Sequence, residues 1–188
     1  VELAELADAF NSMTSQLRET LANLESLVAD RTQALQSSAN VSRYLSTILE
    51  AELLLKEVVV RLDQDMGYEL AEIYQPNGRN RQFVLTATSQ KGEVNPHYLK
   101  DKPRLAALIS RAVHLGKPVQ ESDIQEKEDG LALGTQLTNA HSLLAIPITR
   151  GDQALGVLAV YKKRPDEIDS GDIDLVQSIA NQLAIALQ

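Results

Sequence analysis

The distribution of glycine and proline is the feature that most constrains the fold of this chain. All nine glycines and all six prolines lie between Gly67 and Gly171. Glycine destabilises helices through its backbone entropy, and proline through its missing N–H donor and a steric clash. The segment before Gly67 is therefore free to form one or two very long helices, about 100 Å in total at about 1.5 Å per residue. Helices of this length usually connect one module to the next, which indicates a signalling protein.

Composition limits the remaining possibilities. With 188 residues, 44% of them hydrophobic, the chain can bury one good core, so we expect a single globular domain beside the long helix. The formal net charge of −8 and the lack of a dense Lys/Arg stripe argue against binding to nucleic acid or an anionic membrane. The absence of cysteine excludes disulfides, thiol nucleophiles and thiolate zinc sites, and it fits a cytoplasmic setting. No run of about 18 apolar residues is present, so we expect no membrane-spanning segment.

Apolar residues repeat along the N-terminal segment at alternating steps of three and four, the heptad spacing of a left-handed coiled coil. Two successive steps of four between Met13 and Leu21 form a stutter, which locally unwinds a supercoil. Arg31, Ser38 and Ser42 place polar side chains on the same row. We expect parallel pairing with a second copy; packing on the chain's own domain or on a bundle is the alternative. This N-terminal seam comprises Leu3, Leu6, Phe10, Met13, Leu17, Leu21, Leu24, Val28, Leu35, Leu45 and Leu49.

The start of this segment resembles a known signalling element. The sequence VELAELADAFNSMTSQL at 1–17 is similar to the second helix of a HAMP domain, in which D-E-x-G-E-L-x-x-x-F-N-x-M is usual. Val1 and Ala4 replace the usual Asp and Gly. The residues that match are Glu2, Glu5, Leu6, Phe10, Asn11 and Met13. LESLVADRTQAL at 24–35 resembles the signalling helix that leaves HAMP domains in bacterial sensor kinases. HAMP domains usually sit just inside a membrane-spanning helix, so the resemblance implies the cytoplasmic portion of an inner-membrane-anchored protein, with no membrane contact by this chain itself.

The rest of the chain alternates helical and strand patterns. We expect helices over 41–66 and 104–115, and a final helix capped by Asp169 or Ser170. We expect strands at 71–75, 83–89, 119–120, 142–149 and 154–162, with a polar loop at 122–140. This order predicts an α+β sandwich with an antiparallel sheet, in domains 1–40 and 41–188. The last helix also shows heptad spacing, and we expect this C-terminal seam to pair in the dimer: Ile173, Val176, Ala180, Leu183 and Leu187.

Several segments of the second part resemble a GAF domain. They are SLLAIPI at 142–148, GVLAVY at 156–161 and DIDLVQSIANQLAIAL at 172–187, with GYELAEIY at 67–74 and GKP at 116–118. The resemblance implies a long N-terminal coiled-coil helix that leads into a GAF-like antiparallel sheet flanked by helices. GAF domains bind many small molecules or none, so the resemblance does not identify a ligand.

Candidate catalytic and metal-binding groups are few. No histidine lies in an H-[DE]-x-x-[NTP] phosphoacceptor context, and no two histidines are spaced i, i+4 on a helix. These histidines, His97, His114 and His141, are typical of surface or capping positions. The acidic residues Asp123, Glu126, Glu128 and Asp129 cluster in a solvated loop. Gly-rich phosphate loops, G-x-S-x-G elbows and kinase ATP motifs are also absent from the sequence. We therefore expect neither catalysis nor a metal site.

The GAF resemblance narrows the ligand by exclusion. Bilin-binding GAF domains attach their chromophore through cysteine, and those that reduce free methionine sulfoxide also use cysteine, so both are excluded here. The N-K-F-D-E signature of cyclic-nucleotide binding is absent, and we expect no cofactor, although haem held noncovalently by one histidine stays formally open. The family would place a pocket between the outer sheet face and the segments 95–100 and 122–140. The candidate ligand-binding residues there are Tyr74, His97, Tyr98, Thr135, Gln136 and His141.

Two functional hypotheses follow. The first is a regulatory signal-transduction module of a bacterial membrane-associated sensor, such as a histidine kinase in a two-component system, which relays its state through a parallel helical homodimer. The alternative is a small-molecule sensor that holds a noncovalent ligand under the 122–140 loop. An enzymatic role would need a nucleophile or metal constellation that the sequence does not contain.

Overall fold

The computed structural model describes residues 2–78, 82–92, 94–95, 97–100, 102–122, 124 and 140–187, without the side chains of residues 2–5, 7 and 9. Helix α1 spans Glu2–Gln64 without interruption, as the lack of glycine and proline predicts. Contacts divide the chain into two compact units, Val1–Ile48 and Leu49–Gln188. The first unit is the N-terminal part of α1. The second contains the last turns of α1 and all the other elements.

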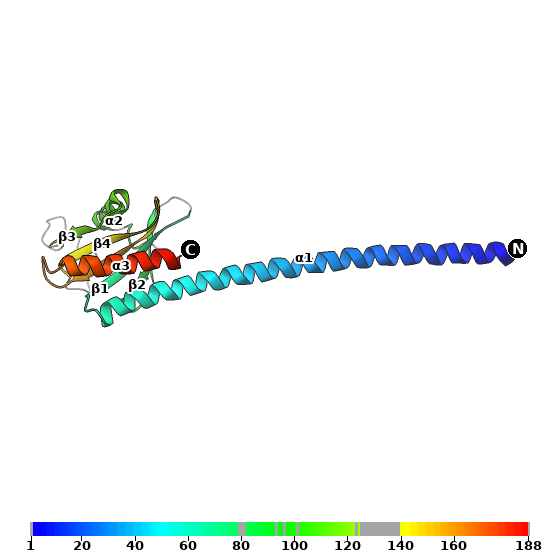
Figure 1. Cartoon of the computed structure of the whole chain (residues 1–188), viewed down its shortest axis with the longest axis horizontal. Coiled ribbons are helices and arrows are strands. Elements are labelled where there is room, and N and C mark those ends of the chain that lie inside the picture. The colour runs from blue at the N-terminus through cyan, green and yellow to red at the C-terminus, as the bar shows by residue number, and fades with distance from the viewer. Residues whose placement is uncertain are drawn as a thin grey trace. The chain divides into compact units, whose positions relative to one another are not determined.

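Five strands form one antiparallel sheet in the second unit (Figure 1). The strands are β1 (Leu70–Pro76), β2 (Phe83–Thr88), β3 (Val119–Glu121), β4 (Ser142–Arg150) and β5 (Gln153–Lys162), in the order β2-β1-β5-β4-β3. Helices α2 (Pro103–Leu115) and α3 (Ser170–Ala186) complete the domain. The predicted α+β class with an antiparallel sheet is therefore confirmed, and each predicted strand lies within two residues of its observed bounds.

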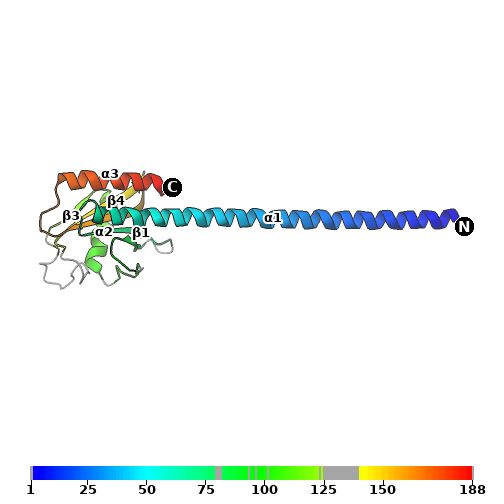
Figure 2. The same cartoon turned by 90° about the horizontal axis from the view of Figure 1, so that it is seen from below.

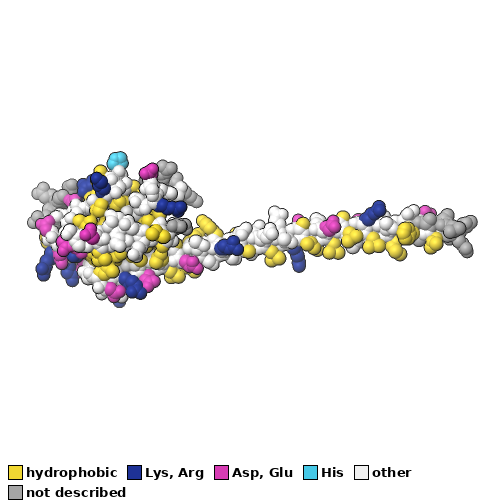
Figure 3. Space-filling model, viewed as in Figure 1, with side chains coloured by type: hydrophobic (Ala, Val, Ile, Leu, Met, Phe, Trp, Pro, Cys, Tyr) yellow, Lys and Arg dark blue, Asp and Glu magenta, His cyan; other side chains and the backbone are white. Residues whose placement is uncertain are grey.

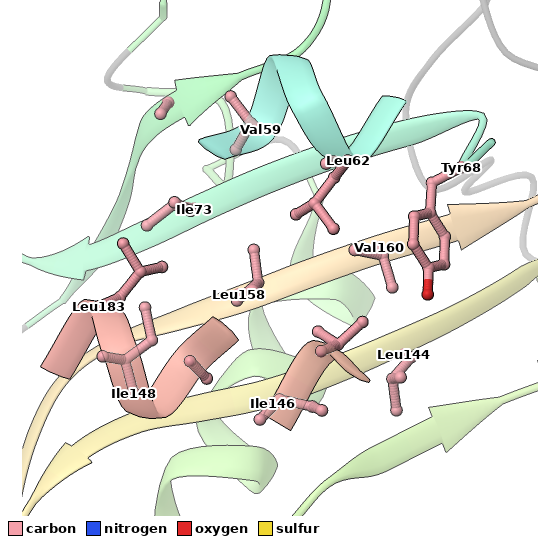
Figure 4. Packing of buried hydrophobic residues seen from close by; sticks show 14 of the residues in the cluster. Val59, Leu62, Tyr68, Ile73, Leu144, Ile146, Ile148, Leu158, Val160 and Leu183 are labelled. Carbon is pink, nitrogen blue, oxygen red and sulfur yellow. The ribbon is translucent and has the colours of Figure 1, made fainter. Parts of the chain in front are cut away.

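The last turns of α1 and helix α3 cover the same face of the sheet (Figure 2). Side chains alternate between faces along a strand, so Ala71 and Ile73 of β1 point to this side. Figure 4 shows Val59 and Leu62 of α1 and Leu183 of α3 over the strands. The three elements are thus held by one hydrophobic core. Its labelled members are Val59, Leu62, Tyr68, Ile73, Leu144, Ile146, Ile148, Leu158, Val160 and Leu183.

The structure corrects the prediction of a C-terminal dimer seam. Val176, Ala180 and Leu183 are buried in this core, and Ile173 and Leu187 pack against it. A helix that lies on a sheet needs an apolar stripe of the same period as a helix in a coiled coil. The row on α3 therefore faces the domain's own sheet and offers no apolar row to a second copy.

Helix α2 covers the opposite face of the sheet. Pro103 begins it, and Gly116 ends it with the positive φ of +60° that suits glycine. Leu105 and Ile109 of α2 pack on alternate residues of the strands, including Val157 of β5. Most of this second core is apolar, but Glu72 of β1 is also on this side, in the middle of the sheet. That carboxyl group is the starting point for the functional site.

Candidate functional site

Glu72 is a buried carboxyl group near the middle of the central strand β1. Its exposed fraction is 1%. The hydroxyl of Tyr161 donates a hydrogen bond to Glu72 Oε2 at 2.9 Å, and the hydroxyl of Tyr74 donates to the same oxygen. Both tyrosines are fully buried. A buried carboxylate destabilises a protein unless donors replace its lost hydration, and here two phenols provide them.

Strand geometry explains how these three side chains meet. Tyr74 follows Glu72 by two residues on β1, so both side chains point to the face covered by α2. On β5, Tyr161 pairs with Leu70, one pair away on the same face, while the residue directly opposite Glu72 is Ala159. The small alanine leaves room above the sheet for the two phenol rings to reach the carboxylate.

Tyr98 and Lys102 add to this cluster from the segment before α2. Tyr98 Oη is buried, and among the described residues no partner meets hydrogen-bond distance and angle limits for it. The Nζ of Lys102 lies 3.2 Å from the centroid of the Tyr98 ring, a cation–π contact. We refer to Glu72, Tyr74, Tyr161, Tyr98 and Lys102 together as the Glu72 cluster.

The environment shifts the titration of these groups. Burial raises the pKa of Glu72 and outweighs the hydrogen bonds from Tyr74 and Tyr161 and the charge of Lys102, which favour the carboxylate. Burial and the adjacent carboxylate also raise the pKa of both hydrogen-bonded tyrosines well above its usual range. The pKa of Tyr98 is raised for the same reasons. The three phenols therefore remain protonated at neutral pH, and Tyr74 and Tyr161 stay hydrogen-bond donors.

The structure brings together two of the six predicted ligand-binding residues. Tyr74 and Tyr98 both belong to the Glu72 cluster. The His97 side chain is exposed on its turn, and His141 is partly buried just before β4, where its backbone joins Ile124 and Lys162. The remaining two predicted residues, Thr135 and Gln136, lie outside the described residues. Whether any of the six binds a ligand stays a prediction.

Sequence reasoning missed Glu72, Tyr161 and Lys102. One signal was available, because Glu72 interrupts the otherwise apolar start of the strand LAEIY. A charged residue within a strand of a sheet covered on both faces is unusual and needs partners. Tyr161 carried no such signal, since aromatic residues are common in strands.

Metal and membrane sites were also searched. Among the described residues, no group of three or more histidines, aspartates and glutamates is placed to hold a metal ion. No helix in the described part of the chain is long and apolar enough to cross a bilayer.

Comparison with known proteins identifies the family. The GAF domain family model matches residues 49–188, about three-quarters of the chain. This chain belongs to the GAF domain family. No curated protein matches it. GAF domains are signalling or sensory modules, and that general role applies here.

Solved structures agree with this fold. The GAF domain region of a protein described as a membrane protein, from Geobacter sulfurreducens PCA, is similar with a TM-score of 0.61 and 18% identity, and covers 77% of this chain and 97% of that one. A type II free methionine-R-sulfoxide reductase from Thermoplasma acidophilum has a TM-score of 0.58 and 18% identity, over 75% and 94%. A domain of a two-component sensor histidine kinase protein from Sinorhizobium meliloti 1021 has a TM-score of 0.54 and 17% identity, over 73% and 90%. At these identities the likeness concerns the fold alone.

Proposed function

We propose that this chain is a regulatory module of a bacterial sensor protein and relays a change of state through parallel pairing of α1 with a second copy. The family supports the signalling role, and a sensor histidine kinase domain is among the proteins that share the fold. We further propose that the parent protein is membrane-anchored, because residues 1–17 resemble the second helix of a HAMP domain. In this proposal the chain regulates a catalytic partner domain and performs no chemistry itself.

The observation that carries the proposal is the exposed apolar row on α1. Figure 3 shows hydrophobic side chains gathered along one edge of this helix. An apolar row over so many heptads is typical of a helix that pairs with another helix. Exposed members of the N-terminal seam, with their exposed fractions, are Leu6 68%, Phe10 70%, Met13 63%, Leu17 57%, Leu21 55%, Leu24 53%, Val28 56%, Leu35 71%, Leu45 59% and Leu49 57%. The Leu3 side chain lies outside the described residues.

A second copy is the occupant that best fits this row. Heptad spacing allows two identical helices in register to place equivalent residues against each other. Leu27, Val41 and Ile48 are also exposed and directly precede seam positions, which widens the apolar surface. The polar residues Ser38 and Ser42 weaken the same row in its middle. A seam that is strong at both ends and weak between them can support two packings of similar stability, as a relay requires.

Contacts within the globular unit provide a route between α1 and α3. Tyr68, shortly after the end of α1, donates a hydrogen bond from its hydroxyl to Asp172 Oδ1 at 2.8 Å. Lys162 of β5 forms an ion pair with Asp172 Oδ2, also at 2.8 Å. Asp172 belongs to the first turn of α3 and is partly buried. A displacement at the end of α1 would therefore reach α3 through one carboxylate as well as through the shared core.

Sedimentation velocity of the chain tests the proposal, with Leu24→Glu against Ser26→Glu as the matched control. Ser26 lies opposite the seam in the heptad register, so it adds the same charge without facing the partner. Leu24 is 53% exposed, and losing its burial in two copies costs about 2–3 kcal/mol, about a thirtyfold or greater rise in the dimer Kd. We expect a dimer that Leu24→Glu dissociates and Ser26→Glu preserves. A monomeric wild-type chain at micromolar concentration, or equal effects of the two variants, would overturn the proposal.

A second candidate function is sensing of a small molecule at the Glu72 cluster. The observation that favours it is the buried Tyr98 hydroxyl, which has no hydrogen-bond partner among the described residues. Such groups in native proteins usually bond to water, an ion or a ligand. A thermal-shift screen of small metabolites and native mass spectrometry of the purified chain test this function. A saturable rise in Tm supports a sensor, whereas no shift and no added mass would leave the relay alone.

A further inference from the structure

We propose that the Glu72 cluster is a recognition site for a small organic ammonium ion, which takes the place that the chain's own Lys102 ammonium occupies over Tyr98. The proposal rests on the second candidate function and names its ligand class. It is carried by three geometric facts: a buried carboxyl group, a buried hydroxyl without a hydrogen-bond partner among the described residues, and an aromatic face that already holds an ammonium group.

The carboxyl group supplies the electrostatic part of the recognition. Glu72 accepts hydrogen bonds from Tyr74 and Tyr161, but these phenols contribute no positive charge. A buried carboxylate bonded only to neutral donors remains attractive to a cation, because the low local polarity strengthens charge–charge interactions. A ligand ammonium beside Glu72 would favour its ionised form and so bind more tightly than at the surface.

Tyr98 supplies the directional part of the recognition. Its ring face attracts a cation through the aromatic quadrupole, and Lys102 Nζ is 3.2 Å from the ring centroid. Its hydroxyl oxygen can accept a hydrogen bond from an ammonium N–H. The ring face, this oxygen and the Glu72 carboxylate all favour positive charge. They therefore form a consistent set of groups for an amine, and a poor one for an anion.

Lys102 is placed to act as an internal competitor. It is the N-cap residue of α2, but its side chain makes no capping hydrogen bond to the helix. The helix contact at this position comes from its backbone, whose carbonyl accepts from the Ala106 N–H at 3.0 Å. The ammonium is carried on a flexible four-carbon stem, so it can move without breaking this contact. Displacement of Lys102 by a ligand would change the charge at the start of α2, and this gives binding a route into the fold.

The experiment titrates the full chain with methylammonium chloride and follows the tyrosine ring resonances by NMR, with sodium chloride at equal ionic strength as the reference. Lys102→Met removes the competitor, and Lys100→Met, an exposed lysine two residues earlier, is the matched control. We expect saturable binding to the wild type, about tenfold tighter binding to Lys102→Met, and no change in Lys100→Met. We expect Glu72→Gln to weaken binding at least tenfold, and its folding is checked from the same spectra.

The outcomes separate this inference from the function on which it rests. If methylammonium does not bind the wild type or Lys102→Met, the ammonium assignment is wrong, even if Glu72→Gln fails to fold. Saturable binding of sodium acetate that Lys102→Met abolishes would show an anion site and also overturn it. If another compound class raises the Tm in the metabolite screen while amines do not, the sensor function stands and only the ligand class fails. If nothing binds, both fail.

Discussion

Gly156 of β5 is the position where the smallest change should most disturb the sheet. A Cβ atom added there would lie 2.7 Å from the backbone carbonyl oxygen of Tyr74 on the neighbouring strand. Two softer contacts, with Gln75 Cγ at 3.4 Å and Ile148 Cδ1 at 3.5 Å, allow little retreat. Because the first contact is with backbone, Gly156→Ala must push β1 and β5 apart. The displaced carbonyl belongs to the residue whose hydroxyl binds Glu72.

The magnitude follows from two opposing effects. Overpacking of this kind costs about 1–3 kcal/mol. Alanine returns about 0.5–1 kcal/mol, because the unfolded chain has less backbone freedom to lose. We therefore expect Gly156→Ala to lower the free energy of unfolding by about 1–2 kcal/mol.

Urea denaturation followed by tyrosine fluorescence measures this change in the globular unit. The chain has no tryptophan, and four of its five tyrosines lie after residue 66. Gly78→Ala is the control, because a Cβ atom there meets nothing within 4 Å and its φ is not positive. We expect Gly78→Ala to match the wild type within about 0.5 kcal/mol. Equal unfolding free energies for the two variants would refute the argument from Gly156.

Three further predictions concern charge, pairing and capping. Since burial raises the pKa of Glu72 above its ordinary value of 4.5, the wild type should lose unfolding free energy relative to Glu72→Gln as pH rises from about 4.5 through the raised pKa. Urea denaturation at several pH values checks this, and a difference that does not vary with pH would contradict it. Replacing Ser38 and Ser42 together with leucine should lower the dimer Kd at least about tenfold and lock signalling, and an unchanged Kd in sedimentation together with unchanged output would count against the seam. Asp169→Ala removes the side chain that accepts from the Asp172 N–H at 2.9 Å in a capping box, and should cost about 0.5–2 kcal/mol in the same denaturation assay.

Local patterns predicted the elements of this fold well. The absence of glycine and proline before Gly67 predicted α1, and Gly116 marked the end of α2. The clearest alternating strands, β4 and β5, were found within one residue of their bounds. These features depend on backbone entropy, missing donors and side-chain periodicity, which act between residues close in sequence. The sequence therefore determines them by itself.

Tertiary structure decided which partner each apolar row meets. The rows on α1 and α3 have the same heptad spacing, yet the one through Leu24 is exposed while the one through Val176 is buried on the sheet. Periodicity describes a stripe on a helix and does not say what covers it. The Glu72 cluster illustrates the same limit, because Tyr161 reaches Glu72 only through the register of β1 with β5, and the two are 89 residues apart. Contacts between residues distant in sequence depend on how strands pair and pack, and only the folded chain determines them.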